Sequence, residues 1–348
     1  MSITTIGLDT AKSVFQVHGL DETGQAKLKK KLQRSQMIPF FEKLERCTIF
    51  LEACGAGHHW ARILIGLGHD VKLIAPQKVT PFVKKGKKND PADAAALTEA
   101  GVRPDMKFVP VKTVEQQAIL AVHSVRTLLV KQQTMLSNAM RGLAAEFGLI
   151  AAKGIDRLDD LMDLIKADKS VPKQALEVAR ELFDQREAVE ERIQTLEADI
   201  VAHARQNEAA RRLATIPGIG PITASLIAAT VSDFGVFKRA RDFAAFLGLV
   251  PRQHSTGGKI RLGKITKTGS REIRKSLYLG ATTMVNRAPE SKTAAGVWTS
   301  GLLLRRLSKK LVAVALANKM ARIAWALMTR SEVYHPEGRV VAAAEPVA

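Results

Sequence analysis

Residues 3–9, ITTIGLD, and residues 48–52, TIFLE, decide how the first third of the chain folds. Each stretch is short, apolar and rich in β-branched residues, and each ends on a carboxylate, so each predicts a buried strand. Residues 13–18 predict a second strand. Residues 26–31 predict a third, reached through the turn at Asp21–Gly24. We therefore expect the chain to begin with a sheet.

Helices alternate with the later strands. Apolar residues at 38, 41 and 44 lie on one face of a predicted amphipathic helix, residues 58–67 predict another helix, and residues 71–74 predict a further strand. A helix then begins at Asp90. The order β-β-β-α-β-α-β-α predicts an α/β fold in three layers, with a sheet of mixed direction.

The charge balance indicates a polyanionic partner. The 348 residues carry a formal net charge of +19, and 46% are hydrophobic, which is typical of a folded protein. Residues 215–348 hold 21 Lys and Arg against 7 Asp and Glu, whereas residues 111–214 hold 15 against 16. Nucleic acid is the commonest partner of such a chain, although a ribosome-associated or membrane-surface protein can share this charge.

The cysteines and the chain ends indicate the compartment. Cys47 and Cys54 are the two cysteines, and they form no CxxC pair, which fits a reducing compartment and argues against a disulfide framework. We identify neither a secretory signal nor an apolar run long enough to span a bilayer, and predict a cytoplasmic protein. The Ala-, Val- and Pro-rich tail, residues 336–348, is expected to be disordered.

Four carboxylates are candidate metal ligands: Asp9, Glu52, Asp90 and Asp93. The first two end predicted strands, and the last two lie three apart at a helix start, on one face. Crowded carboxylates repel one another unless cations lie between them, and Mg²⁺ (or Mn²⁺) prefers oxygen ligands. The last pair has an alternative role, because Asp90, Pro91 and Asp93 also make a good helix cap. We interpret His58 and His59 as partly exposed surface residues.

Two long helices are predicted in the middle of the chain, over residues 113–147 and 172–206. In the second, Val189, Ile193, Leu196 and Ile200 step by four, three and four, which is the seam of a coiled coil. The seam either packs against the other helix of an antiparallel hairpin or forms a dimer contact.

A glycine hairpin opens the last third. Residues 216–224, IPGIGPITA, resemble the turn of a helix-hairpin-helix element, in which Gly218 and Gly220 allow a tight turn and Pro221 begins a helix whose free N–H groups can bind a phosphate. The alternative is a plain turn between packed helices.

A basic, glycine-rich segment follows at residues 248–270, in an otherwise mostly helical region. Glycines and hydroxyls between the cations allow close approach to phosphates, and Ser255 is either a phosphate contact or a nucleophile. The candidate nucleic-acid contacts are Lys84, Lys85, Lys87, Lys88, Gly218, Gly220, Arg252, Lys259, Arg261, Lys264, Lys267 and Arg274.

These motifs together resemble a known family. The segments 6–9 (IGLD), 52–55 (EACG), 89–94 (NDPADA), 216–220 (IPGIG) and 251–258 (PRQHSTGG) follow the order and spacing of the DEDD transposases of the insertion-sequence one-ten family, with the one-eleven-eleven subgroup the most similar. The resemblance runs from about residue 3 to residue 330.

The resemblance implies a fold and a domain division. It implies a RuvC-like (ribonuclease H fold) domain at 1–110, a helical coiled-coil linker at 111–210, and a C-terminal transposase domain at 211–335. Two departures are present: Cys54 stands where many relatives have Thr, and Thr256 stands where relatives often have a second Ser, which leaves Thr256 as a rival to Ser255.

It also implies a mechanism and partners. The four acids would hold Mg²⁺, and Ser255 would attack DNA to form a covalent phosphoserine link. A structured non-coding RNA, the bridge RNA, would guide the protein to target and donor DNA, and homodimers would join into tetramers. Two other functions remain open: a Mg²⁺-dependent hydrolytic nuclease of the Holliday-junction type, which forms no covalent intermediate, and a non-catalytic nucleic-acid scaffold.

Overall fold

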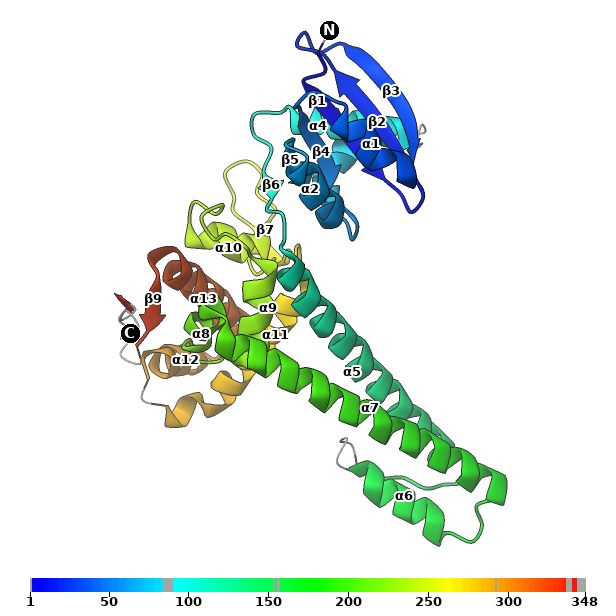
Figure 1. The fold of residues 1–348 in the computed structure, drawn as a ribbon. Helices are drawn as coiled ribbons and strands as arrows, with labels where there is room; N and C mark the ends of the chain where they lie inside the picture. The colour runs from blue at the N-terminus through cyan, green and yellow to red at the C-terminus, as the bar shows by residue number, and fades with distance from the viewer. Residues whose placement is uncertain are drawn as a thin grey trace, which may run out of the picture. The chain divides into compact units, whose positions relative to one another are not determined.

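A computed structural model describes residues 2–83, 90–152, 154, 157–291, 293–335 and 340–342. The chain divides into two compact units, Met1–Thr113 and Val114–Ala348, and each is described by itself (Figure 1). The predicted basic loop, with Lys84, Lys85, Lys87 and Lys88, lies outside the described residues.

The N-terminal unit is built on one mixed sheet. Its strands are β1 (Thr5–Thr10), β2 (Val14–Leu20), β3 (Ala26–Gln33), β4 (Thr48–Glu52), β5 (Asp70–Ile74) and β6 (Phe108–Val109), in the spatial order β3-β2-β1-β4-β5-β6. The first three pair antiparallel, β1, β4 and β5 are parallel, and β6 returns antiparallel. The predicted mixed α/β sheet is confirmed, and its order is that of a RuvC-like fold. The short strand β6 was not predicted.

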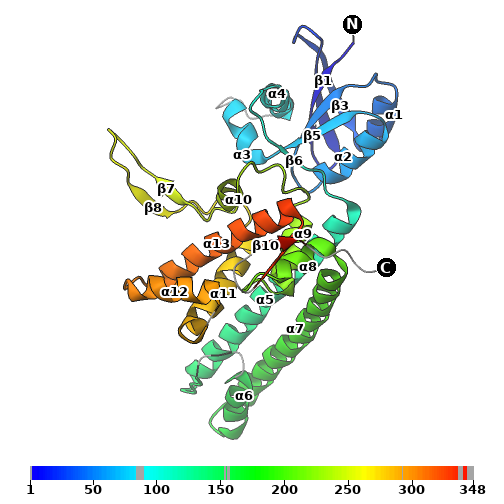
Figure 2. The same cartoon turned by 90° about the vertical axis from the view of Figure 1, so that its left-hand side faces the viewer.

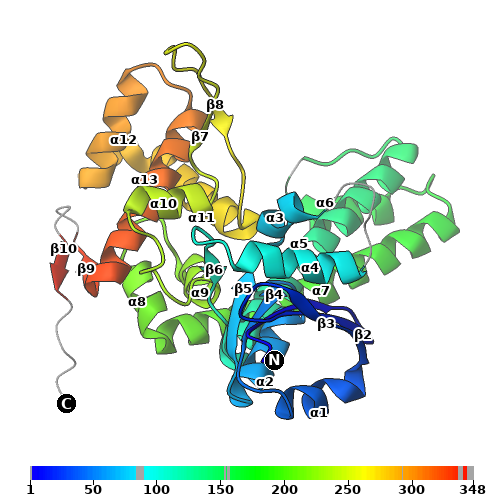
Figure 3. The same cartoon turned by 90° about the horizontal axis from the view of Figure 1, so that it is seen from above.

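Helices cover both faces of this sheet. The helices α1 (Met37–Glu42) and α2 (Gly57–Gly66) lie on one face, and α4 (Asp90–Gly101) lies on the other (Figure 3). A core containing Phe15, Leu51 and Trp60 fills the first interface. A smaller core, in which Phe50 packs with Leu97, fills the second. The short helix α3 (Pro76–Val79) follows β5. The three layers are therefore as predicted.

The two predicted long helices are confirmed as α5 (Val114–Glu146) and α7 (Lys173–Gln206), which lie side by side (Figure 1). Arg126 of α5 forms an ion pair with Glu197 of α7, and Gln133 donates to Glu190, so the helices run antiparallel. Within the seam, Ile193 is 5% exposed and Ile200 is fully buried. The seam therefore packs within the hairpin of a single chain. A third helix, α6 (Leu158–Ala167), packs near its far end.

The rest of the C-terminal unit is mostly helical, as predicted. Its helices are α8 (Glu208–Ala214), α9 (Pro221–Thr230), α10 (Ala240–Phe246), α11 (Arg271–Arg287), α12 (Ala294–Leu304) and α13 (Lys309–Arg330). Two small hairpins complete the unit: β7 (Pro251–Gln253) pairs with β8 (Leu262–Ile265), and β9 (Glu332–Tyr334) pairs with β10 (Val340–Ala342). Of the predicted disordered tail, residues 340–342 thus form a strand, and residues 336–339 and 343–348 lie outside the described part of the chain.

From the sequence we identified no apolar run long enough to span a bilayer, but one helix does meet that criterion by its length and composition. The helix α13 has 22 residues, and an 18-residue window of it has a mean hydropathy of 1.5. In the structure, however, α13 is a central core helix, and Val312, Leu316 and Leu327 on its buried face are at most 1% exposed. Its apolar composition is therefore used in packing against the neighbouring helices.

Candidate active site

Strand register brings Asp9 beside Glu52. Leu8 of β1 pairs with Leu51 of the parallel strand β4, so the next residue of each strand is a carboxylate. Neighbouring strands lie about 4.8 Å apart. Because Leu8 and Leu51 are fully buried on the opposite face, alternation directs both carboxylates to the face that α4 covers. Both acids are half-buried.

The ends of the same two strands are joined by a further contact. Thr10 Oγ1 lies 3.6 Å from Cys54 Sγ, so the residue after Asp9 touches the loop that follows Glu52. This contact gives Cys54 a packing role beside the acids, which is consistent with its not being a ligand.

Gly7 allows α4 to approach the acids closely. A Cβ atom at Gly7 would lie 2.1 Å from the carbonyl oxygen of Ala94 and 2.3 Å from Thr98 Oγ1, so only glycine permits this contact. Asp93 directly precedes Ala94, lies one turn before the buried Leu97, and is half-buried. The first turn of α4 therefore places Asp93 above the sheet face that carries Asp9.

The fourth acid is described only in part. The backbone of α4 begins at Asp90, but the Asp90 side chain lies outside the described residues. Among the described residues, no three His, Cys, Asp or Glu side chains form a group that could hold a metal ion. Asp9 and Glu52 thus share one edge of the sheet, and their carboxylate oxygens are donors of the kind that Mg²⁺ prefers. The alternative role of Asp90 as a helix cap depends on the same side chain and stays a prediction.

His58 is buried, and the interpretation of this residue as surface-exposed was wrong. It is 7% exposed, and its Nδ1 accepts a hydrogen bond of 3.2 Å from the backbone N–H of Lys112. Burial, Lys112 and Arg62 together lower the pKa of His58 to about 4. His58 is therefore a neutral residue that attaches the end of the N-terminal unit to α2, while His59 is exposed as expected.

Ser255 lies on an exposed arm. It occupies the loop between β7 and β8, which projects from the helices of the C-terminal unit (Figure 2). Every residue from 251 to 264 is exposed. The Gln253 side-chain amide donates a hydrogen bond of 2.8 Å to Ser255 Oγ. Gly257 and Gly258 have φ values of 56° and 76°, a left-handed turn that glycine makes at no steric cost. The serine hydroxyl is thus presented to solvent at the tip of a hairpin.

A second serine, Ser225, has two histidine partners, as a catalytic serine often has one, but it is inaccessible to substrate. Ser225 Oγ on α9 lies 2.9 Å from His123 Nε2 on α5 and 2.9 Å from His203 Nδ1 on α7. Sequence reasoning missed this cluster because its members are up to 102 residues apart. Ser225 is fully buried, so the cluster joins three helices and cannot meet a substrate.

The predicted basic contacts divide into two groups. Lys259, Arg261, Lys264 and Lys267 are exposed on the β7–β8 hairpin and its base. Arg274 instead donates to the carbonyl oxygens of Leu247, at 2.9 Å, and Thr268, at 2.7 Å. Its guanidinium therefore closes the base of the hairpin.

Arg252 also has a partner within the fold. It donates across the hairpin to the Thr266 carbonyl at 3.3 Å, and the residue remains exposed. The geometry thus leaves part of this guanidinium accessible to a phosphate.

The two glycines of the predicted hairpin have different surroundings. Gly218 has a φ of 86°, and a Cβ there would lie 2.8 Å from Met284 Sδ and 2.9 Å from Met320 Cε. Gly220 is exposed, with open space where a Cβ would stand, and is the N-cap of α9. Gly218 is thus required for packing between helices, and Gly220 is the glycine that a phosphate could approach.

A RuvC-like sheet with acids at one edge, joined in sequence to a helical unit with an exposed hydroxyl, defines a class of DNA-processing enzymes. Comparison with known proteins places the chain within that class. A family model for DEDD transposases of the IS110 type, described as "Transposase", matches residues 6–147. A second model, described as "Transposase IS116/IS110/IS902 family", matches residues 210–295.

Relatives match along nearly the whole chain. A Sinorhizobium fredii protein named "Putative transposase y4pF/y4sB" is 50% identical over 95% of this chain and 86% of its own length. The transposase for insertion sequence element IS1111A of Coxiella burnetii is 40% identical, over 95% and 91%. The transposase for IS1328 of Yersinia enterocolitica is 39% identical, over 96% and 99%.

The chain therefore belongs to the IS110 family of transposases, which confirms the resemblance noted in its motifs. It is an enzyme of DNA recombination that acts in the transposition of a mobile element.

Proposed function

We propose that this transposase cuts and rejoins DNA through a covalent phosphoserine intermediate on Ser255, with Asp9, Glu52, Asp90 and Asp93 as the acidic half of the active site. The observation that carries the proposal is the shared sheet edge, where register sets Asp9 beside Glu52 and Gly7 admits the first turn of α4. Mg²⁺ (or Mn²⁺) bound by these acids would polarise the scissile phosphate.

The serine step conserves the energy of the broken bond. As the bond from Ser255 Oγ to phosphorus forms, one bond from phosphorus to a sugar oxygen breaks. The serine proton leaves to solvent, and the departing sugar oxygen takes up a proton. The reverse reaction with a different DNA end rejoins the strand, so no ATP is required. The exposed position of Ser255 on a hairpin supports this role, because the hydroxyl must reach a phosphate held elsewhere.

The proposal extends to partners. The exposed cations of the β7–β8 hairpin would contact the DNA backbone, and Gly220 at the start of α9 would contact a phosphate. A bridge RNA would select target and donor DNA, and homodimers would assemble into tetramers. Since the substrate is cellular DNA, the expected location is the cytoplasm.

A denaturing gel tests the covalent step. The full-length protein is incubated with a labelled element end, Mg²⁺ and the RNA that co-purifies with it. We expect a slow-migrating, protease-sensitive band, which Ser255→Ala abolishes and the neighbouring Thr256→Ala retains. Asp9→Asn should abolish both the band and the cleavage in Mg²⁺. Mass spectrometry would map the attachment residue.

Two results would contradict the serine assignment. A band that persists in Ser255→Ala and disappears in Thr256→Ala would identify Thr256 as the nucleophile. Cleaved DNA with free ends, formed equally well by Ser255→Ala, would indicate the hydrolytic junction nuclease instead.

A further inference from the structure

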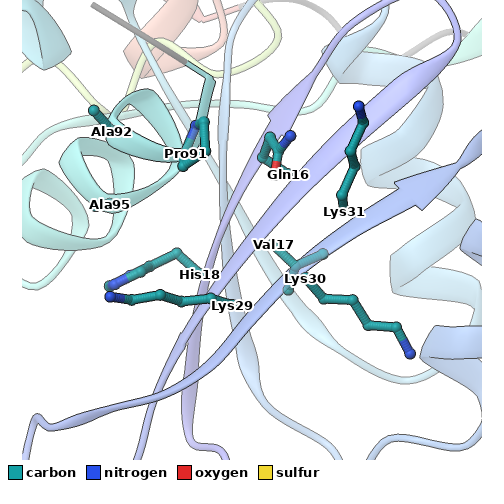
Figure 4. Close-up of a pocket in the computed structure, with 9 residues that line it drawn as sticks. All are labelled: Gln16, Val17, His18, Lys29, Lys30, Lys31, Pro91, Ala92 and Ala95. Atoms are coloured by element: carbon teal, nitrogen blue, oxygen red, sulfur yellow. The ribbon is translucent and has the colours of Figure 1, made fainter. Parts of the chain in front are cut away.

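A cavity of about 310 Å³ lies between β2, β3 and the first turn of α4 (Figure 4). Pro91, Ala92 and Ala95 form its helical wall. The strands contribute Gln16, Val17, His18, Lys29, Lys30 and Lys31, and no acid is among these lining residues. None of these residues belongs to the acidic quartet or to the basic hairpin.

Strand register places this cavity beside the acids. Gln16 of β2 pairs with Asp9 on one side and with Lys31 of β3 on the other, so the three form one row across the sheet. Two residues along the strands, in the next row on the same face, His18 pairs with Lys29. Two strand spacings separate Lys31 from Asp9, which corresponds to about 10 Å between their Cα atoms.

Side-chain alternation assigns Lys29 and Lys31 to the face that carries Asp9. Phe15 and Val17 are buried on the opposite face, so Gln16 and His18 point toward α4. In Figure 4 the His18 ring and the Lys29 ammonium lie side by side and point toward that helix, whereas the Lys31 ammonium points away from them. Lys30 points the other way, and its Nζ lies 5.1 Å from the centre of the Phe40 ring.

The electrostatics of the cavity favour an anion. Lys29 and Lys31 are exposed, and neither forms an ion pair with a described carboxylate. His18 Nδ1 lies 3.1 Å from Thr98 Oγ1, and burial together with Lys29 lowers the pKa of His18, so the ring is neutral near pH 7. The cavity thus combines two ammonium groups with the side-chain amide of Gln16 and the neutral ring of His18.

We propose that this cavity binds a backbone phosphate of the DNA strand that enters the acid-bearing edge, with Lys29 and Lys31 as the ligands. The inference rests on the proposed function, because that function assigns the scissile phosphate to the Asp9 edge. Successive phosphates of a B-DNA strand rise about 3.4 Å each, so the bound phosphate lies within a few nucleotides of the scissile bond. Lysine ammonium groups bind phosphate as point charges, so the contact fixes the position of the strand without reading its sequence.

A matched pair of double variants tests the site. Lys29→Gln with Lys31→Gln removes both cavity charges. Lys43→Gln with Arg46→Gln removes the same charge from exposed residues that do not line the cavity, and thus controls for the overall field. Binding of the full-length protein to an element-end duplex is measured over a range of salt concentrations, with Asp9→Asn in every variant to prevent cleavage.

The cavity variant should bind at least about tenfold more weakly, and the slope of log affinity on log salt should fall by about one, because one lost phosphate contact contributes about 0.9. The control should change affinity less than about threefold. Equal losses in the two double variants, or no loss in either, would overturn the proposal. An RNA of the same sequence serves as a second probe, and an effect on RNA binding alone would also reject the DNA assignment.

Single uncharged phosphates locate the contact. In a methylphosphonate scan, one backbone phosphate of the duplex at a time is made uncharged. At one position, within a few nucleotides of the cleaved bond, this change should weaken DNA binding by the unaltered protein. The same change should not alter DNA binding by the cavity variant. Absence of any such position refutes the assignment. This test is separate from that of the serine step: a chain that forms no covalent product can still show the lysine-dependent position, and a chain that forms the product can lack it.

Discussion

At the scale of single residues, the close approach of α4 to the sheet depends on the lack of a side chain at Gly7. This residue lies between Ile6 and Leu8, both fully buried, and points toward α4. The absence of a side chain lets α4 lie directly on β1, with Ala94 and Thr98 against Gly7. Glycine is therefore part of the site without touching a substrate, since any Cβ there moves the helix that carries two of the acids.

Gly7→Ala should weaken both stability and DNA cleavage. The added Cβ would lie 2.1 Å from a backbone carbonyl oxygen, so α4 must shift. Overpacking of this kind costs about 1–3 kcal/mol in the free energy of unfolding, which urea denaturation measures. Gly66→Ala is the control, because Gly66 lies in α2 with open space around it and should be neutral or slightly stabilising. Unchanged stability and cleavage in Gly7→Ala would show that α4 does not need this contact.

At the scale of elements, three helices of the C-terminal unit are joined through buried polar groups. The hydroxyl of Ser225 on α9 forms hydrogen bonds with the rings of His123 on α5 and His203 on α7. Burial, Arg126 and His203 lower the pKa of His123 to about 4. The junction between the long hairpin and the helical core is thus sensitive to acid.

The free energy of unfolding should therefore fall as the pH decreases. His123 has a pKa near 6.5 in the unfolded chain and about 4 in the folded chain, so between these values the unfolded state binds more protons. The contribution is complete above pH 6.5 and declines by roughly 2–3 kcal/mol toward pH 4. Urea denaturation should show a shallower pH dependence for His123→Gln, whereas the exposed His59→Gln should keep the original slope. An identical slope in the two variants would exclude His123 as the source.

At the scale of the whole molecule, residues 215–348 hold 21 Lys and Arg against 7 Asp and Glu, whereas the four candidate metal-binding acids lie in the N-terminal unit. A reaction that uses Asp9 and Ser255 together must bring both units to a single phosphate. The proposed guide RNA and the proposed tetramer are means of doing so, because a polyanion can bind the basic surfaces and a second copy can supply the missing half of a site.

Gentle purification should accordingly yield a ribonucleoprotein. We expect an absorbance spectrum dominated by nucleic acid and, after extraction, an RNA of defined sequence. Light scattering should give a dimer, and addition of element and target DNA should give a tetramer. Ribonuclease treatment should abolish sequence-specific DNA cleavage. A preparation free of nucleic acid that cleaves DNA specifically would contradict the guide-RNA proposal, and a monomer that does so would contradict the assembly.

The sequence by itself determined the strands and long helices, because residues 3–9, 48–52 and 189–200 carry periodicities that depend only on neighbours along the chain. It also placed Asp9 and Glu52 at the ends of two strands, which the strand register sets side by side, whereas their union with Asp90 and Asp93 in one metal site stays a prediction. Other properties depended on contacts between distant segments, which no local pattern encodes. Tertiary packing alone buried His58 against Lys112, enclosed Ser225 between two histidines, and directed Lys29 toward α4.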